Sequence, residues 1–199
     1  MTKIKICGLM SAADAQSVNE VHPDYAGMIL SPGFRRSVTQ ETAAAIRSAL
    51  EPAIPAVGVF VNAEPAEIAA YLERGIIQLV QLHGNEDDAY LAALREITGA
   101  QIIKAFRIRT QADVQTAKQS AADIILLDSG TGTGKVFDWT LLSGITRPYL
   151  LAGGLNPENA AEAVVTLHPA GVDVSSGVET DGRKDPEKIR AFVRAVRGL

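Results

Sequence analysis

A cysteine and an aspartate stand at the ends of two apolar segments, and their side chains suit proton transfer. Cys7 closes the segment that begins at Lys3, and Asp128 closes Ile124–Leu127. An ionised thiol is a base. A carboxyl group behind an apolar segment can have a raised pKa, so that it carries a proton to donate. The pair could therefore act as base and acid in one cycle. Each residue also has a simpler interpretation, because a lone cysteine is often a small buried apolar residue and a terminal aspartate often caps or faces solvent.

His83 and Arg36 follow two other apolar segments and are candidates for substrate contacts. His83 ends its segment, and the alternation of side chains along a strand places it on the same face as Gln81. Arg36 comes after a turn that contains Pro and Gly, where a guanidinium could bind a substrate carboxylate through two N–H groups. The other interpretation is that Arg35 and Arg36 are both solvated, and the sequence leaves this open.

Two short turns rich in glycine and serine are the best candidates for a phosphate site. Glycine lets a phosphate approach backbone N–H groups closely, and a helix start nearby adds a favourable dipole. Both turns could instead be simple tight turns. Their candidate phosphate ligands are Gly153, Gly154, Ser175, Ser176 and Gly177.

The loop Ser129–Lys135 is also rich in glycine, but it does not match a nucleotide-binding motif. Ser129 stands where the P-loop needs its first glycine, and Val136 stands where the motif needs Ser or Thr. The loop is better interpreted as a lid beside Asp128.

Composition narrows the class of protein. The chain has 199 residues, 47% of them hydrophobic and 21% charged, with a net charge of −4. These values predict one soluble domain, residues 1–199, and make a nucleic acid or a membrane an unlikely partner. One cysteine cannot form an internal disulfide, which favours the cytoplasm. No cluster of metal-ligating residues is present in the sequence, so no metal is expected.

Apolar segments typical of strands recur roughly every 24 residues and alternate with amphipathic segments typical of helices. This alternation predicts an α/β protein, a single (β/α)8 TIM barrel of parallel strands, rather than an open doubly wound sheet. The strands begin near Lys3, Tyr25, Ile54, Ile76, Gln101, Ala122, Tyr149 and Gly171. The helices are Ala12–Val21, Thr39–Leu50, Pro65–Arg74, Glu86–Ile97, Gln111–Lys118, Asp138–Leu142, Pro157–Val165 and Pro186–Val196.

Several details of the barrel follow from local chemistry. Pro65 and Pro157 are expected at the first position of their helices, and Asp138 and Asp185 are expected to cap theirs. Active sites of this fold lie at the carboxyl ends of the strands, where Cys7, His83 and Asp128 stand. The two other histidines, His22 and His168, each precede a proline between a helix and a strand, so we expect them at the opposite end.

Eight blocks, in this order along the chain, together form a highly specific pattern. They are Lys5–Gly8, Gly58–Asn62, Gln81–Gly84, Leu127–Asp128, Gly132–Trp139, Gly153–Asn159, Asp173–Glu179 and Gly182–Asp185. Through these blocks nearly the whole chain resembles the phosphoribosylanthranilate isomerase family of tryptophan biosynthesis.

The resemblance implies an enzyme that converts N-(5-phosphoribosyl)anthranilate, a phosphorylated aminosugar, to 1-(2-carboxyphenylamino)-1-deoxyribulose 5-phosphate by an Amadori rearrangement. It implies Cys7 as general base, Asp128 as general acid, Arg36 as the ligand of the anthranilate carboxylate, and the two glycine and serine turns as the phosphate site. No cofactor is implied, and the sequence leaves a monomer or a homodimer open. One departure is Phe34, where relatives commonly carry Ser.

Two rivals remain at this point. The related isomerase of histidine synthesis runs the same rearrangement, but it is expected to carry an aspartate where this chain has Cys7. A phosphosugar-binding protein that keeps the barrel without catalysis would not need both Cys7 and Asp128.

Overall fold

Eight parallel strands close into a barrel in the computed structural model, which describes residues 1–128, 139–142 and 144–198. Neighbouring strands in sequence are hydrogen-bonded, and β1 closes the ring by pairing with β8. The predicted (β/α)8 barrel is confirmed. Its strands are β1 (Lys3–Ile6), β2 (Tyr25–Ile29), β3 (Ala56–Phe60), β4 (Leu79–Leu82), β5 (Gln101–Arg107), β6 (Ile124–Asp128), β7 (Tyr149–Ala152) and β8 (Gly171–Val174).

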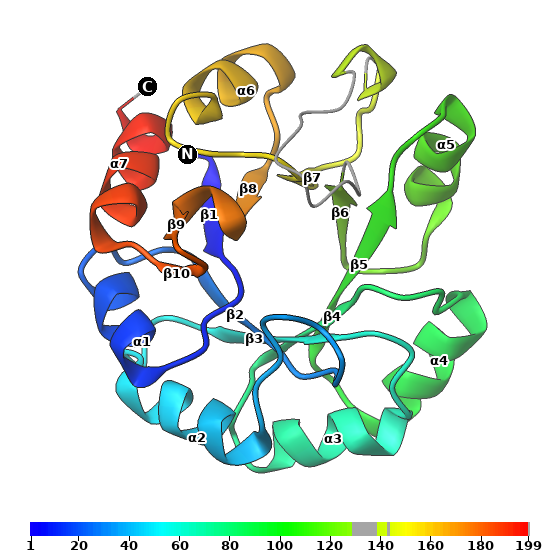
Figure 1. Cartoon of the computed structure of the whole chain (residues 1–199). Helices are drawn as coiled ribbons and strands as arrows, with labels where there is room; N and C mark the ends of the chain where they lie inside the picture. Colours follow the sequence, from blue (N-terminus) through cyan, green and yellow to red (C-terminus); the bar gives the residue numbers. More distant parts are fainter. Residues whose placement is uncertain (129–138, 143, 199) are drawn as a thin grey trace.

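The helices surround the ring of strands (Figure 1). After β6 the described residues form only a short 3-10 helix, η1, and after β8 a second one precedes a small antiparallel hairpin. None of the described helices is long and apolar enough to span a membrane. The outer elements are α1 (Ala12–Asn19), α2 (Gln40–Ala49), α3 (Pro65–Glu73), α4 (Asp88–Ile97), α5 (Gln111–Gln119), η1 (Trp139–Leu142), α6 (Ala160–Leu167), η2 (Ser176–Val178), β9 (Glu179–Thr180), β10 (Arg183–Lys184) and α7 (Pro186–Arg197).

Alternation along the strands separates two cores. Ile4 and Ile6 of β1 face the helices and belong to the large apolar core between strands and helices. A smaller core that includes Leu126 and Leu150 fills the barrel interior. Lys5 lies on the inward face of β1, fully buried, and Cys7 follows on the same face. The strand therefore packs one face on helices and presents the other to the barrel interior, as its sequence predicts.

The predicted starts of three strands and two helices are too early by two residues or more, and one of these helices is α4, which begins at Asp88 rather than Glu86. Ile54 and Ile76 are buried, but their N–H groups bond back to Glu51 and Tyr71, so they belong to turns. β3 and β4 begin later, and β6 likewise begins at Ile124 rather than near Ala122.

Pro157 is not the first residue of α6, which begins at Ala160. The side chain of Asn156 accepts hydrogen bonds from the N–H groups of Glu158 and Asn159, and this turn delays the helix. Pro65 does begin α3, and the carboxylate of Asp185 caps α7. The lid expected at Ser129–Lys135 and the cap expected at Asp138 lie outside the described residues.

Candidate active site

One cavity at the carboxyl ends of the strands brings together most of the residues that the sequence singled out. Its volume is about 200 Å³. The predicted site residues that line it are Cys7, Arg36, His83, Asp128, Gly153, Gly154, Ser175 and Ser176. His22 and His168 lie at the opposite end of the barrel, in the turns before β2 and β8, as expected.

Cys7 lies at the mouth of the barrel beside a lysine. Gly27 makes room for both side chains, because a β-carbon there would lie 2.8 Å from Cys7 Sγ and 3.1 Å from Lys5 Nζ. Burial raises the pKa of the Cys7 thiol; Lys5 and Lys184 lower it and Asp173 raises it, and the net shift is upward. Lys5 thus favours the thiolate without outweighing burial.

A buried ion pair lies next to Cys7 in the barrel interior. Lys5 Nζ bonds Asp173 Oδ1 at 2.9 Å, and the two residues face each other across the pairing of β1 with β8. Burial acts to lower the pKa of Lys5, but the neighbouring Asp173 and Cys7 raise it more, so the ammonium keeps its charge. A fixed cation therefore stands next to the thiol, where it favours the thiolate.

Asp128 contacts His83, and His83 contacts Gln81. His83 Nε2 lies 3.3 Å from Asp128 Oδ2, and His83 Nδ1 lies 3.0 Å from Gln81 Nε2. An amide nitrogen only donates, so Nδ1 accepts and the ring hydrogen of neutral His83 lies on Nε2, directed at Asp128. Gln81 Oε1 is buried and has no hydrogen-bond partner among the described residues.

A second buried ion pair fixes the loop that follows His83. Glu86 accepts hydrogen bonds from the N–H groups of Asn62 and Gly84, at 2.7 and 2.9 Å, and pairs with Lys104 Nζ at 2.8 Å. Burial acts to raise the pKa of Glu86, but the bonds from Lys104 and the backbone lower it below its usual value. The carboxylate ties the ends of β3, β4 and β5 together beside the cavity.

The two glycine and serine turns form one wall of the cavity. Gly153 and Gly154 have φ angles of 90° and 71°, a left-handed conformation that favours glycine. Ser175 Oγ is buried without a partner in the part of the chain that the structure describes. Gly177 does not line the cavity; a β-carbon there would overlap the carbonyl oxygen of Leu155, so this glycine lets the two turns touch.

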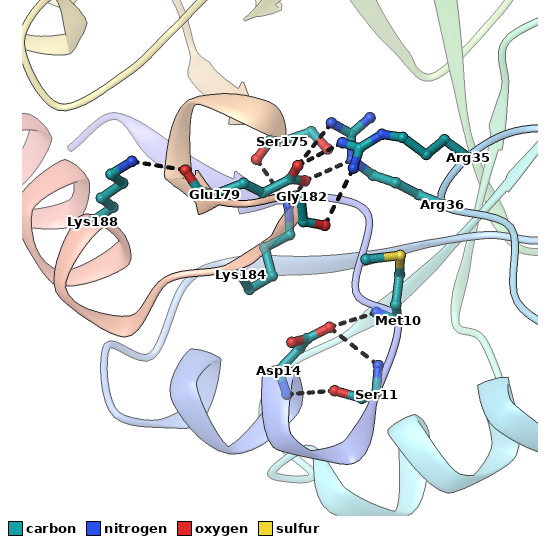
Figure 2. Close-up of polar contacts among 10 residues, drawn as sticks. All are labelled: Met10, Ser11, Asp14, Arg35, Arg36, Ser175, Glu179, Gly182, Lys184 and Lys188. Carbon is teal, nitrogen blue, oxygen red and sulfur yellow. Dashed lines mark hydrogen bonds and ion pairs between the residues drawn. The ribbon is translucent and has the colours of Figure 1, made fainter.

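Arg36 crosses the turn that follows Cys7. A β-carbon on Gly8 would lie 2.7 Å from Arg36 Cδ and 2.8 Å from Ser175 Oγ, so the arginine stem packs directly on this turn. The guanidinium bonds Glu179 through Nε at 2.6 Å and Nη2 at 3.1 Å (Figure 2).

Three charged residues of the site are not indicated as site residues by the sequence patterns: Asp173, Glu179 and Lys184. One indication of Asp173 was available, because closure of a barrel pairs the first strand with the last and so sets Lys5 opposite Asp173. Glu179 and Lys184 lie in blocks that carry the family resemblance, but nothing in their spacing indicates that Glu179 reaches Arg36 or that Lys184 pairs with Glu179.

A family model and several relatives similar in sequence indicate the same family. A family model described as N-(5'-phosphoribosyl)anthranilate (PRA) isomerase matches residues 4–195. Relatives named N-(5'-phosphoribosyl)anthranilate isomerase include one from Endomicrobium trichonymphae, 44% identical over 204 residues and covering 100% of both chains. Another, from Lactiplantibacillus plantarum, is 45% identical over 197 residues and covers 98% of this chain and 91% of its own length.

Solved structures agree with these relatives. The phosphoribosyl anthranilate isomerase of Thermotoga maritima superimposes with a TM-score of 0.92 at 36% identity, with 100% of both chains covered. A phosphoribosyl anthranilate isomerase in complex with reduced 1-(o-carboxyphenylamino)-1-deoxyribulose 5-phosphate superimposes with a TM-score of 0.90 at 35% identity, again over 100% of both chains.

Proposed function

The chain belongs to the N-(5'-phosphoribosyl)anthranilate isomerase family, and from this premise we propose that Cys7 and Asp128 catalyse its reaction as general base and general acid. The reaction converts N-(5'-phosphoribosyl)anthranilate to 1-(2-carboxyphenylamino)-1-deoxyribulose 5-phosphate in tryptophan biosynthesis. The observation that supports the proposal is that a thiol just after β1 and a carboxyl group at the end of β6 line one cavity with the glycine turn after β7 and the serine turn after β8.

Asp128 acts first in this mechanism. Its carboxyl group donates a proton to the ring oxygen of the ribose as the bond from that oxygen to C1 breaks, and the nitrogen lone pair forms the C1=N bond of an iminium ion. The positive nitrogen makes the hydrogen on C2 acidic. The Cys7 thiolate removes that hydrogen, which gives an enamine with a hydroxyl group on C2. This enaminol then takes a proton on C1 and loses the hydroxyl proton, so the product is an isomer of the substrate.

His83 orients Asp128 in this proposal. Its Nε2–H donates to Asp128 Oδ2, because Gln81 donates to the other ring nitrogen. A carboxyl group held through Oδ2 has a fixed orientation in the cavity that it lines. Gln81 and His83 therefore help to set the direction of proton transfer, as a third group orients the base in other acid–base sites.

The substrate's two anionic groups have separate ligands. Arg36 binds the anthranilate carboxylate, and the turns at Gly154 and Ser176 bind the phosphate through backbone N–H groups. The cavity of about 200 Å³ is small for the whole substrate, but a neighbouring cavity of about 460 Å³ shares Ile29, Val59 and His83 with it. Phe34 lines this second cavity, so we place the aromatic ring there.

A double-mutant cycle tests the two catalytic roles. Cys7→Ala and Asp128→Asn should each lower kcat by about 10²–10⁴-fold while the protein stays folded. The double variant should lose far less than the product of the two single losses, because the groups act in one cycle. Independent, multiplying losses would contradict the proposal. The substrate of the related histidine-pathway isomerase serves as a second assay, and we expect much slower turnover with it.

We also infer a cytoplasmic enzyme that acts as a monomer or a homodimer. Its one cysteine is buried and unpaired, which suits a reducing compartment. One structural relative is described as monomers generated from the dimeric isomerase of Thermotoga maritima, so both assemblies are compatible with this barrel.

A further inference from the structure

A single carboxylate beside the cavity holds three cationic side chains. Glu179, the first residue of β9, lies with its side chain 5% exposed between Arg36, Arg35 and Lys184 (Figure 2). The oxygens of Glu179 lie 2.6 Å from Arg36 Nε, 2.6 Å from Arg35 Nη2 and 3.0 Å from Lys184 Nζ. The cluster therefore carries a net positive charge.

The β9–β10 hairpin holds this carboxylate in place. Glu179 and Lys184 are paired residues of the hairpin, and Lys184 Nζ also donates to the carbonyl oxygen of Ser175 at 2.8 Å. Lys188 Nζ donates to the carbonyl oxygen of Glu179 at 2.8 Å. Burial acts to raise the pKa of Glu179, but Arg36, Lys184 and Arg35 lower it to about 2, so the group is ionised at neutral pH.

The contact with Glu179 uses only one edge of the Arg36 guanidinium. A guanidinium has five N–H groups, and Glu179 takes the one on Nε and one on Nη2. The two on Nη1 and the second on Nη2 have no partner among the described residues. Arg36 lines the cavity, and its stem rests on Gly8. The guanidinium is therefore fixed by its stem and by one edge.

We propose that Glu179 is a positioning residue: it binds one edge of the Arg36 guanidinium so that the other edge faces the substrate carboxylate. This inference rests on the proposed role of Arg36. One planar guanidinium then bridges two carboxylates, one from the protein and one from the substrate. Arg35 and Lys184 offset the negative charge of Glu179, so the substrate carboxylate still meets a positive environment.

If charge alone mattered, loss of Glu179 would change the binding of the substrate carboxylate in the direction opposite to the one that positioning predicts. Glu179 is negative and stands beside the binding site of an anion, so neutralising it would strengthen anion binding if distance and charge were all that mattered. If Glu179 instead fixes the guanidinium, its loss lets Arg36 move, and binding of the carboxylate weakens. The sign of the change therefore distinguishes the two explanations.

Two ligands that differ only in the carboxylate provide the test. The first is reduced 1-(2-carboxyphenylamino)-1-deoxyribulose 5-phosphate, and the second is its phenylamino counterpart without the carboxylate. Dissociation constants are measured by titration calorimetry for the natural protein, Glu179→Gln, Glu179→Asp and Arg36→Ala. Glu187→Gln is the matched control, because Glu187 also pairs with an arginine but lies on the exposed side of α7.

The inference predicts a loss confined to the carboxylated ligand. Both Glu179 variants should bind the carboxylated ligand about 10-fold to 100-fold more weakly, because a small displacement of a binding group such as the Arg36 guanidinium can have an effect of this size. Glu179→Asp keeps the charge and withdraws the carboxylate, so it should show the loss as well. Binding of the counterpart should change less than about threefold in either variant, and Glu187→Gln should leave both ligands unaffected. With the natural substrate, KM should rise more than kcat falls.

Different failures have different meanings. If Arg36→Ala still prefers the carboxylated ligand as the natural protein does, the proposed role of Arg36 is wrong. If Arg36→Ala loses the preference and both Glu179 variants keep or strengthen it, only the role of Glu179 is overturned. A protein that no longer folds in either Glu179 variant also overturns it, because the carboxylate would then be needed for the barrel itself.

Discussion

Polar side chains serve different purposes at the two ends of the barrel. At the amino-terminal end, the residue immediately before β2, β4 and β6 accepts a hydrogen bond from a backbone N–H near the start of the preceding strand. The N···O distances are 2.8–2.9 Å, and the pairs are Asp24 with Ile4, Gln78 with Ala56, and Asp123 with Ile102. These side chains complete the hydrogen bonding of the sheet where the ladder begins.

At the carboxyl-terminal end, by contrast, several polar groups lack a partner in the described part of the chain. Gln81 Oε1 and Ser175 Oγ are buried without a hydrogen-bond partner among the described residues. Both residues line the cavity, as does Arg36 with its second guanidinium edge. Buried polar groups without partners cost stability, so a fold keeps them where a ligand can satisfy them.

The two ends of the barrel therefore differ in role. Backbone hydrogen bonds at the amino-terminal end contribute to the free energy of folding, whereas the groups at the carboxyl-terminal end are the ones that we propose bind the substrate. Changes at the amino-terminal end should lower stability and leave turnover unchanged. Changes at the carboxyl-terminal end should lower turnover and leave stability nearly unchanged.

The largest expected effect is on turnover in Cys7→Ser. The hydroxyl group of serine is far too weakly acidic to ionise beside Lys5, so kcat should fall by at least about 10²-fold. The melting temperature should stay close to that of the natural protein, because the two side chains are similar in size. Near-normal turnover in a folded protein would mean that Cys7 is only a structural residue. It would contradict the proposed difference in role between the two ends.

A smaller effect, on stability, is expected at the other end. Asp24→Ala and Asp123→Ala each remove the acceptor of a strand N–H, which should lower the free energy of unfolding by about 1–2 kcal/mol. The residues lie before different strands, so the two losses should add in the double variant to within about 0.5 kcal/mol. Urea unfolding measures the stability, and kcat should be unchanged. The Asn variants keep an acceptor oxygen and should be milder. A double variant that loses turnover as strongly as Cys7→Ser would contradict the comparison.

Periodicity explains why the fold was predictable from the sequence. Strand and helix segments alternate along the whole chain, and a closed parallel barrel buries both faces of such strands. The errors were local. The apolar side chains of Ile54 and Ile76 are typical of strand residues, but the backbone forms turns at both positions. Pro157 read as a helix start because the side-chain hydrogen bonds of Asn156 cannot be seen in the sequence.

The site was predictable where residues stand at strand ends and unpredictable where loops meet. The fold alone brings Cys7 and Asp128 to one end of the barrel. The contact between Arg36 and Glu179 depends on the conformations of a loop and a hairpin that are far apart in sequence, and no periodic pattern encodes it. Lys5 and Asp173 are intermediate, since their pairing follows once the barrel is known to close.

The smallest expected effect is a shift in the pH dependence of kcat/KM, and it tests how the carboxyl-terminal end tunes its base. The proposed mechanism needs the Cys7 thiolate, so kcat/KM should rise with pH through the pKa of the thiol. That pKa lies above its usual value because burial outweighs the opposing effect of Lys5. Lys5→Met removes a group that lowers this pKa and should move the rising limb to higher pH.

Asp173→Asn should move the same limb in the opposite direction. Asp173 raises the pKa of Cys7, so neutralising it removes one of the two effects that oppose Lys5, and only burial remains. The two shifts should therefore differ in sign. Asp24→Ala, at the other end of the barrel, should leave the limb in place. Shifts of the same sign in both site variants would mean that the limb does not report the Cys7 thiol, because a lysine and an aspartate act on one thiol with opposite charge.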